Sequence, residues 1–350
     1  MGRVYRNHAA TLKRGVCLGL HRVGVLRPIS FVQWLATNQC CLSCPFCESS
    51  SGEPGANELG YEEALDLIRD LAGMGVRYFV LSGGEPLMRP DICALMAEAN
   101  RHGLVLGLVT NGWHVAQLEQ RLRSLRFFLY FTSIDGPPDF HDRVRGRQGA
   151  FSRAMQGLDV FARMDVPARL VNTVVHPGNI DQLPALRDII AGSAATSWRL
   201  TPVSAVGRAA GNPAFELSSS QLRELANFVR ESRRRLNADF GESHTYLGCL
   251  DGHVAGKPFF CGAGLSRCSI MPDGDVLGCH QIYDRRYSEG NIRDKPFSRI
   301  WREGFARFRR NEFPADCRTC PHLAACRGGC WAEMEKRGGC LKSAWDQGDG

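Results

Sequence analysis

The sequence predicts an α/β protein, a partial (β/α)6 barrel that is followed by a small cysteine-rich domain. Apolar runs with strand character alternate with amphipathic helical segments about once every thirty residues. This alternation ends near residue 236, and beyond residue 249 cysteine, glycine and proline are dense while apolar periodicity is weak. A segment with so little apolar core is usually stabilised by bound metal.

The predicted elements follow one another in a regular order. The first strand is the apolar run 29–36, and the last helix, 218–236, begins behind a serine-rich N-cap. Between them we expect helices at 61–72, 91–101, 115–125, 151–163 and 183–190, and strands at 76–81, 104–110, 127–134, 168–175 and 196–203. Such alternation implies parallel strands joined by right-handed crossovers, and six units are two short of a closed eight-fold barrel. Reactive groups are expected at the carboxyl ends of the strands.

Length and composition set the domain organisation. We expect a basic N-terminal extension over residues 1–28, the barrel over 29–240 and the second domain over 241–350. Neither a membrane-spanning apolar run nor a signal-peptide layout is apparent, which predicts a cytoplasmic protein. The net charge is +7, but no nucleic-acid motif accompanies it. In a reducing compartment, the fifteen cysteines favour metal binding or chemistry over disulfides.

The stretch CCLSCPFC, residues 40–47, follows the first strand directly. Cys40, Cys44 and Cys47 have the spacing C-x3-C-x2-C. Three thiolates cannot complete a four-iron cluster, so one iron would stay open to another molecule. Zinc is the competing metal, but structural zinc normally takes four ligands, and a fourth is found only if Cys41 or a distant histidine joins.

At this point the chain resembles the radical S-adenosylmethionine (radical SAM) superfamily, whose signature is this cysteine loop after the first strand of a partial barrel. Three later strand ends also match, with SGGEP at 82–86, TNG at 110–112 and SIDG at 133–136. Paired glycines allow close approach of backbone to a ligand, and Asp135 is expected to accept hydrogen bonds from the ribose. The resemblance implies that the cofactor-binding residues are Gly83, Gly84, Glu85, Pro86, Asn111, Ser133, Asp135 and, as weaker matches, Asn172 and Arg208.

The second domain carries another cysteine pattern. Its spacing, C-x12-G-x4-C followed by C-x2-C-x5-C-x3-C and a last cysteine, resembles the SPASM extension of radical SAM proteins. That resemblance implies two auxiliary four-iron clusters. The outer ligands would be Cys317, Cys320, Cys326 and Cys340, and the inner ligands Cys261, Cys279 and Cys330. Cys268, slightly favoured, and Cys249 are the candidates for a fourth inner ligand, and a zinc ribbon is the alternative for the whole region.

The resemblance implies a radical SAM oxidoreductase or maturase. It would cleave S-adenosylmethionine reductively to a 5′-deoxyadenosyl radical, which abstracts a hydrogen atom from a peptide or protein. A reductant such as flavodoxin or ferredoxin is expected. A separate leader-binding protein is also expected, because only about thirty residues precede the first strand.

Other interpretations stay open. Tetrapyrrole or small-molecule cofactor biosynthesis is the alternative within the superfamily. A non-catalytic metal-binding module is the alternative outside it, and such a module would not cleave S-adenosylmethionine. No catalytic acid or base is identified. Tyr283 and Asp284 are candidates for proton transfer, and His280 for supporting a cluster.

Overall fold

The computed structural model describes residues 29–241, 254, 261–309, 315–321, 323 and 328–337, and structural statements below refer to these residues. The predicted N-terminal extension 1–28 lies outside them. So do Cys326 and Cys340, two predicted outer ligands, and Cys249, a candidate for the fourth inner ligand.

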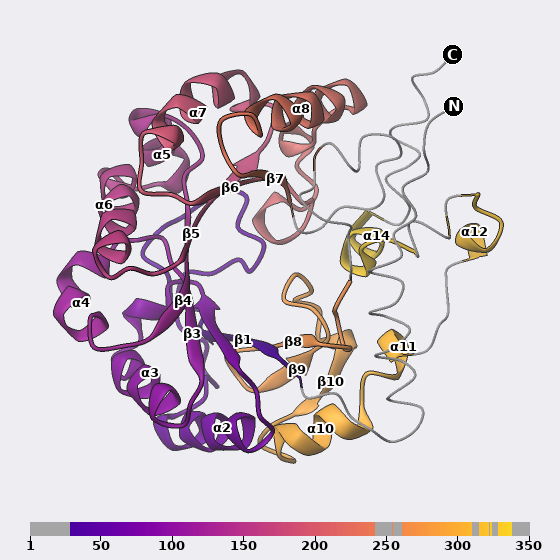
Figure 1. Cartoon of the computed structure of the whole chain (residues 1–350). Helices are drawn as coiled ribbons and strands as arrows, with labels where there is room; N and C mark the ends of the chain where they lie inside the picture. Colours follow the sequence, from indigo (N-terminus) through magenta and orange to yellow (C-terminus); the bar gives the residue numbers. More distant parts are fainter. Residues whose placement is uncertain are drawn as a thin grey trace.

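Seven parallel strands form the barrel wall in chain order (Figure 1). They are β1 (Phe31–Thr37), β2 (Tyr78–Gly83), β3 (Val105–Val109), β4 (Phe127–Ser133), β5 (Ala168–Val175), β6 (Ser197–Pro202) and the short β7 (Ala238–Phe240). The first six are the predicted strands, so the expected partial barrel is confirmed.

Helices cover the outer side of these strands (Figure 1). They are α2 (Tyr61–Gly73), α3 (Ile92–Arg101), α4 (Val115–Leu122), α5 (Pro138–Arg145), α6 (Ala150–Arg163), α7 (Leu183–Ala191) and α8 (Ser219–Ser232). As expected, α8 begins at a serine: Ser218 Oγ accepts from the backbone of Gln221, and Gln221 Oε1 accepts from the backbone of Ser218. Helix α5 was not expected from the sequence.

The chain then returns to the free edge of β1. There β8 (Arg267–Ile270) pairs parallel with β1, and β9 (Asp275–Leu277) and β10 (Ser288–Asn291) add antiparallel strands, which makes a ten-stranded sheet. The later described helices are α10 (Phe297–Glu303), α11 (Ala306–Arg309), α12 (Ala315–Arg318) and α14 (Trp331–Arg337).

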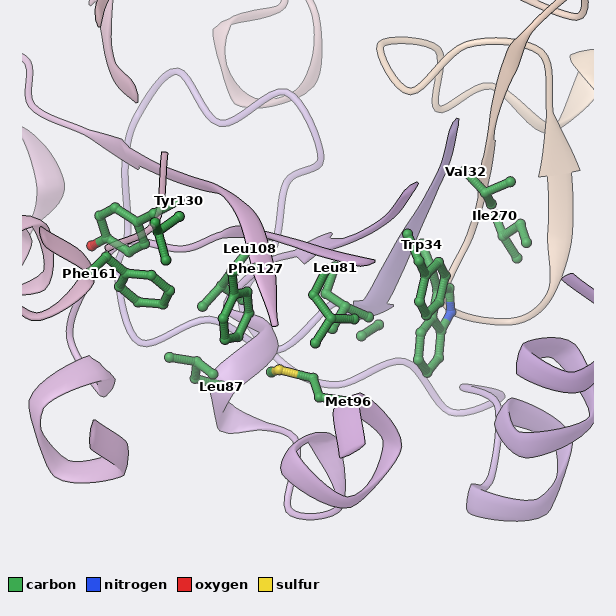
Figure 2. Close-up of a cluster of buried hydrophobic side chains, with 14 of the residues drawn as sticks. Val32, Trp34, Leu81, Leu87, Met96, Leu108, Phe127, Tyr130, Phe161 and Ile270 are labelled. Atoms are coloured by element: carbon green, nitrogen blue, oxygen red, sulfur yellow. The ribbon is translucent and has the colours of Figure 1, made fainter. Parts of the chain in front are cut away.

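One hydrophobic core spans the barrel and these added strands. Figure 2 shows Ile270 of β8 beside Val32 and Trp34 of β1, and the register pairs Trp34 with Ile270. Polar contacts cross the same junction, because the backbone of Leu59 donates to the carbonyl of Pro272 at 2.7 Å. Residues 267–309 are therefore continuous with the barrel in sheet and core, and the boundary near residue 240 stays a prediction.

Candidate active site

The cysteine loop lies at the carboxyl end of β1. Its two sides are tied together, because Cys40 N donates to Gly52 O at 2.8 Å and Gly52 N donates to Asn38 O at 3.0 Å. Cys44 and Phe46 are buried, whereas Cys40 and Cys47 are partly exposed. This is the position at which an α/β barrel places its reactive groups.

The end of β2 supports this loop from one side. Gly84 N donates to Thr37 O at 2.9 Å, and Glu85 N donates to Gln39 O at 2.7 Å. A Cβ at Gly83 would lie 2.3 Å from Thr37 O, and one at Gly84 would lie 2.3 Å from Gln39 O. The two glycines were expected to let a ligand approach; in this structure the backbone that they accommodate is that of residues 37–39.

The segment after β6 supports the loop from another side. Arg208 donates to three loop carbonyls: its backbone N to Cys47 O at 3.0 Å, its Nε to Cys44 O at 2.6 Å and its Nη1 to Ser51 O at 2.6 Å. Gly207 has φ +59°, and a Cβ there would lie 2.3 Å from Cys47 O. The described contacts of Arg208 therefore support the cysteine loop rather than a cofactor.

Glu85 joins the ends of β2 and β3. Its buried carboxylate accepts from the Thr110 hydroxyl at 2.8 Å and from the backbone of Asn111 at 2.8 Å and of Leu87 at 3.0 Å. Burial raises the pKa of Glu85 to about 7. Pro86 follows as the first residue of the 3-10 turn η1 (Pro86–Met88). The carboxylate expected to bind the cofactor thus aligns two strand ends.

Asn111 is the predicted residue whose side chain reaches the cysteines. Its Nδ2 lies 3.5 Å from Cys41 Sγ and 3.9 Å from Cys40 Sγ. Burial raises the pKa of the Cys40 thiol to about 12. A coordinated metal reverses this preference, because its positive charge favours the thiolate.

Arg145, at the end of α5, is a site residue that the sequence analysis missed. Its Nε donates to Asp135 Oδ2 at 2.5 Å, and its Nη1 lies 3.5 Å from Cys44 Sγ. Its Nη2 is buried and has no hydrogen-bond partner among the described residues. Arg145 also lines a cavity inside the barrel. A buried donor left unpaired beside a cavity is suited to an anionic ligand group.

The expected role of Asp135 does not fit this arrangement. Asp135 is fully buried, and its second carboxylate oxygen accepts from the backbone of Val174 at 3.0 Å. Its backbone N donates to Nδ1 of His141, whose pKa burial lowers to about 4, so that the imidazole is neutral. Asp135 therefore positions Arg145 and is not available to ribose hydroxyls.

A cavity of about 490 Å³ occupies the barrel interior beside the cysteine loop. Two of the predicted cofactor-binding residues line it: Ser133 on β4 and Asn172 on β5, whose Oδ1 accepts from the Thr201 hydroxyl at 2.8 Å. Cys44 and Cys47 also line it. Its volume is in the range of ligand sites for small molecules.

The SPASM-like segment closes part of this cavity. His280, Gln281 and Tyr283 are among its lining residues, and burial raises the pKa of the Tyr283 phenol well above its usual range. Asp284, the other candidate for proton transfer, forms an ion pair with Arg286 and is not among the described lining residues.

Three of the described cysteines in the SPASM segment, Cys268, Cys279 and Cys330, pack among apolar side chains. Cys279 packs against the buried group formed by Ile282, Cys330 and Ala332, so two of the predicted inner ligands lie in one hydrophobic cluster. Cys268 is buried on β8 opposite Val32, where burial raises the pKa of its thiol well above the usual value. Among the described residues, no three His, Cys, Asp or Glu side chains form a group that could hold a single metal ion.

The chain's own residues fit an iron–sulfur cluster with an anionic ligand beside it. Cys40, Cys44 and Cys47 supply three soft thiolate donors on one loop, which two strand ends support. The unpartnered Nη2 of Arg145 lies beside the same cavity. These two features give the site both a metal-binding and an anion-binding part.

Comparison with known proteins defines the class. The radical SAM superfamily profile matches residues 34–188, and the SPASM profile, an iron–sulfur cluster-binding domain, matches residues 261–321. The chain belongs to the radical SAM superfamily and carries a SPASM domain. It is an enzyme of that class, and its cofactors are S-adenosylmethionine and [4Fe–4S] clusters.

Individual proteins of this superfamily are similar to the chain over most of its length. The mycofactocin maturase MftC of Mycolicibacterium smegmatis is 32% identical, with 85% of this chain and 77% of that protein covered. The PqqA peptide cyclase of Ruegeria pomeroyi is 31% identical over 87% of this chain and 82% of that protein, and the AdoMet-dependent heme synthase of Methanosarcina barkeri is 27% identical over 85% and 90%. The fold is similar to Streptococcus suis SuiB bound to S-adenosylmethionine, with TM-score 0.71, 19% identity and coverage of 91% and 76%.

None of the described helices has the length and hydropathy needed to cross a bilayer.

Proposed function

We propose that this enzyme is a peptide maturase, which oxidises or crosslinks a peptide or protein substrate. The cavity carries the proposal, because it runs from the cysteine loop to residues 280–283 of the SPASM segment. Relatives named as a mycofactocin maturase and a PqqA peptide cyclase support a peptide as the substrate. A substrate in this cavity would contact the loop of Cys44 and Cys47 on one side and the residues that follow Cys279 on the other.

Different residues of the barrel would bind the cluster and S-adenosylmethionine. We assign Cys40, Cys44 and Cys47 to the cluster that binds S-adenosylmethionine, and Arg145 to the carboxylate of that cofactor. Ser133 and Asn172, which line the cavity, would bind the ribose in place of Asp135. When bound, these cofactors supply a carbon-centred radical that removes a hydrogen atom from the substrate. The apolar lining, which includes Val80 and Phe131, excludes water and competing hydrogen donors.

The proposal also includes the auxiliary clusters, the protein partners and the cellular compartment. The SPASM domain, residues 241–350, holds an inner and an outer auxiliary cluster. The inner ligands are Cys261, Cys279, Cys330 and either Cys268 or Cys249, and the outer ligands are Cys317, Cys320, Cys326 and Cys340. A flavodoxin or ferredoxin supplies electrons, a separate protein binds the leader of the substrate, and the enzyme works in the cytoplasm.

Iron content tests the cluster assignment. After anaerobic reconstitution, we expect roughly 12 irons per chain in the wild type and roughly 8 when Cys40, Cys44 and Cys47 are all changed to Ala, because each cluster holds four irons. Roughly 4 irons with about two zincs would remove the auxiliary redox role. Zinc alone, with no iron lost on mutation, would contradict the radical chemistry.

A second candidate is tetrapyrrole biosynthesis, which the similarity to AdoMet-dependent heme synthases favours. Mass spectrometry separates the two functions. The reconstituted enzyme would be incubated with short peptides encoded beside its gene, and separately with porphyrins. Loss of two hydrogens from a peptide supports the maturase, whereas a change in the porphyrin mass alone refutes it.

A further inference from the structure

One tryptophan and two arginines form a stack beside the cysteine loop. The guanidinium of Arg147 lies 3.6 Å from the centroid of the Trp113 ring, and that of Arg153 lies 5.7 Å from it. All three side chains are partly exposed. We name Trp113, Arg147 and Arg153 the arginine–tryptophan patch. An aromatic ring orders a guanidinium without neutralising it, so the patch presents two ordered positive charges.

The patch is joined directly to the cysteine loop. Arg147 Nη1 donates to Cys41 O at 3.2 Å, and Ser43 N donates to Arg145 O at 3.1 Å. Gly146 lies so close that a Cβ there would be 2.0 Å from the Ser43 hydroxyl oxygen. Ser43 itself is exposed. The solvent-facing tip of the loop and the turn that carries Arg147 therefore form one surface.

Acidic residues offset only part of the charge of this segment. Asp135 pairs with Arg145, but the described residues form no ion pair with Arg147 or Arg153 of the patch. Residues 143–158 contain four arginines and no aspartate or glutamate. Asp142, just before them, uses its carboxylate to accept from the backbone of Gly149 at 2.6 Å and of Phe151 at 2.8 Å, which caps α6. Such a positive surface attracts acidic partners and accelerates their association.

We propose that the arginine–tryptophan patch is the docking surface for an acidic one-electron donor protein that carries a flavin or an iron–sulfur cluster. The proposal rests on the proposed function, in which the loop of Cys40, Cys44 and Cys47 holds a cluster that must be reduced. One electron leaves the donor and one enters that cluster. None of the three patch residues is among the described lining of the substrate cavity, which favours a donor over an acidic peptide substrate.

Charge reversal at Arg153 tests the proposal, because the described contacts of Arg153 are with Trp113 and Gln156, whereas Arg147 contacts the cysteine loop. The matched control is Arg230→Glu, which changes an exposed arginine of α8, on another side of the barrel (Figure 1). Reduction of the reconstituted enzyme would be followed by anaerobic stopped-flow absorbance. The donors are fully reduced flavodoxin, an acidic protein, and photoreduced 5-deazariboflavin, a small uncharged molecule.

We expect Arg153→Glu to slow reduction by flavodoxin about tenfold or more at low ionic strength, and Arg230→Glu to leave the rate unchanged. The difference shrinks at high salt because exposed charges are screened. Reduction by the small donor keeps its rate in both variants, and Arg153→Lys restores the rate with flavodoxin.

Three results would overturn the proposal. Equal slowing with both donors would make Arg153 a residue that positions the cysteine loop. An unchanged flavodoxin rate would place the donor elsewhere. Weaker binding of an acidic peptide with unchanged electron transfer would assign the patch to the substrate. Failure of the cluster assignment on which the proposal rests is distinguishable, because it appears as a wild-type enzyme without the loop cluster's iron before any donor is added. Failure of the maturase function is also distinguishable, because it appears in the mass of the product and not in the rate of reduction.

Discussion

At the scale of the residue, Arg145 connects three parts of the site. It binds Asp135 at the end of β4, lies beside Cys44 of the cysteine loop and lines the cavity. Because Asp135 holds its Nε and Cys44 lies beside its Nη1, the direction of the third nitrogen is fixed by the fold. A preorganised guanidinium loses little conformational entropy when it binds a carboxylate.

We therefore expect Arg145→Lys to raise the dissociation constant for S-adenosylmethionine about tenfold or more, because a lost charge-assisted hydrogen bond costs about 1.5–3 kcal/mol. Isothermal titration would measure this constant. Affinity for 5′-methylthioadenosine, which lacks the amino acid part, should stay within about twofold of its wild-type value. The control is Arg143→Lys, on the exposed side of the same helix. Equal losses for both ligands would mean that Arg145 only supports the loop.

At the scale of the element, the cysteine loop depends on close backbone contacts from its neighbours. Gly207→Ala introduces a Cβ 2.3 Å from Cys47 O, which the loop can relieve only by moving. We expect the reconstituted variant to lose iron from this loop, falling toward roughly 8 irons per chain. Iron analysis and cluster absorbance after anaerobic desalting would measure the loss.

Gly211→Ala separates this steric clash from backbone strain. Gly211 also has a positive φ, +71°, but no heavy atom lies within 4 Å of its Cβ position. Both substitutions cost about 1 kcal/mol for the left-handed backbone, and Gly207→Ala alone adds the clash. Equal iron retention in the two variants would show that the contact with Cys47 does not hold the loop.

The long elements of the barrel could be predicted from the sequence, because each has enough apolar residues to show a period. The strand predicted at 168–175 has the observed bounds, and the helix predicted at 61–72 ends one residue early. By contrast, β7 to β10 have three or four residues each, too few for a period to appear. Helix α5 was missed for a similar reason, because its sequence PDFHDRVR is short and mostly polar.

The site was predictable only where local spacing defines it. The spacing of Cys40, Cys44 and Cys47 identified the loop, and the strand ends located the segments around it. Arg145 has no such signal, because its role depends on contact with Cys44 across 101 positions of the chain. Gly83 and Gly84, at the end of β2, were predicted to let a ligand approach, but the backbone that lies against them is that of residues 37–39, a contact that only the folded structure reveals.

At the scale of the whole molecule, the barrel and the SPASM segment share a sheet edge. The pairing of β8 with β1 extends the sheet, and the ion pair between Arg293 and Glu63, 2.5 Å long, connects the segment to α2. Ser298 N also donates to Asp70 Oδ2 at 2.7 Å. A shared core of this kind couples the two cysteine regions mechanically, because opening one exposes apolar surface of the other.

This coupling predicts the effect of Ile270→Ala. Ile270 is fully buried on β8, so its truncation should cost about 3 kcal/mol through lost burial and the cavity left behind. If sheet and core form one cooperative unit, the loss appears both at β9 and at β5. Native-state hydrogen exchange of the reconstituted enzyme would measure protection in both strands. The matched control is Leu106→Ala, which truncates an equally buried residue of β3 and should lower protection in the same two strands.

If Ile270→Ala lowered protection at β9 and left β5 unchanged, the SPASM segment would unfold independently, as a separate domain beginning near residue 240 would do.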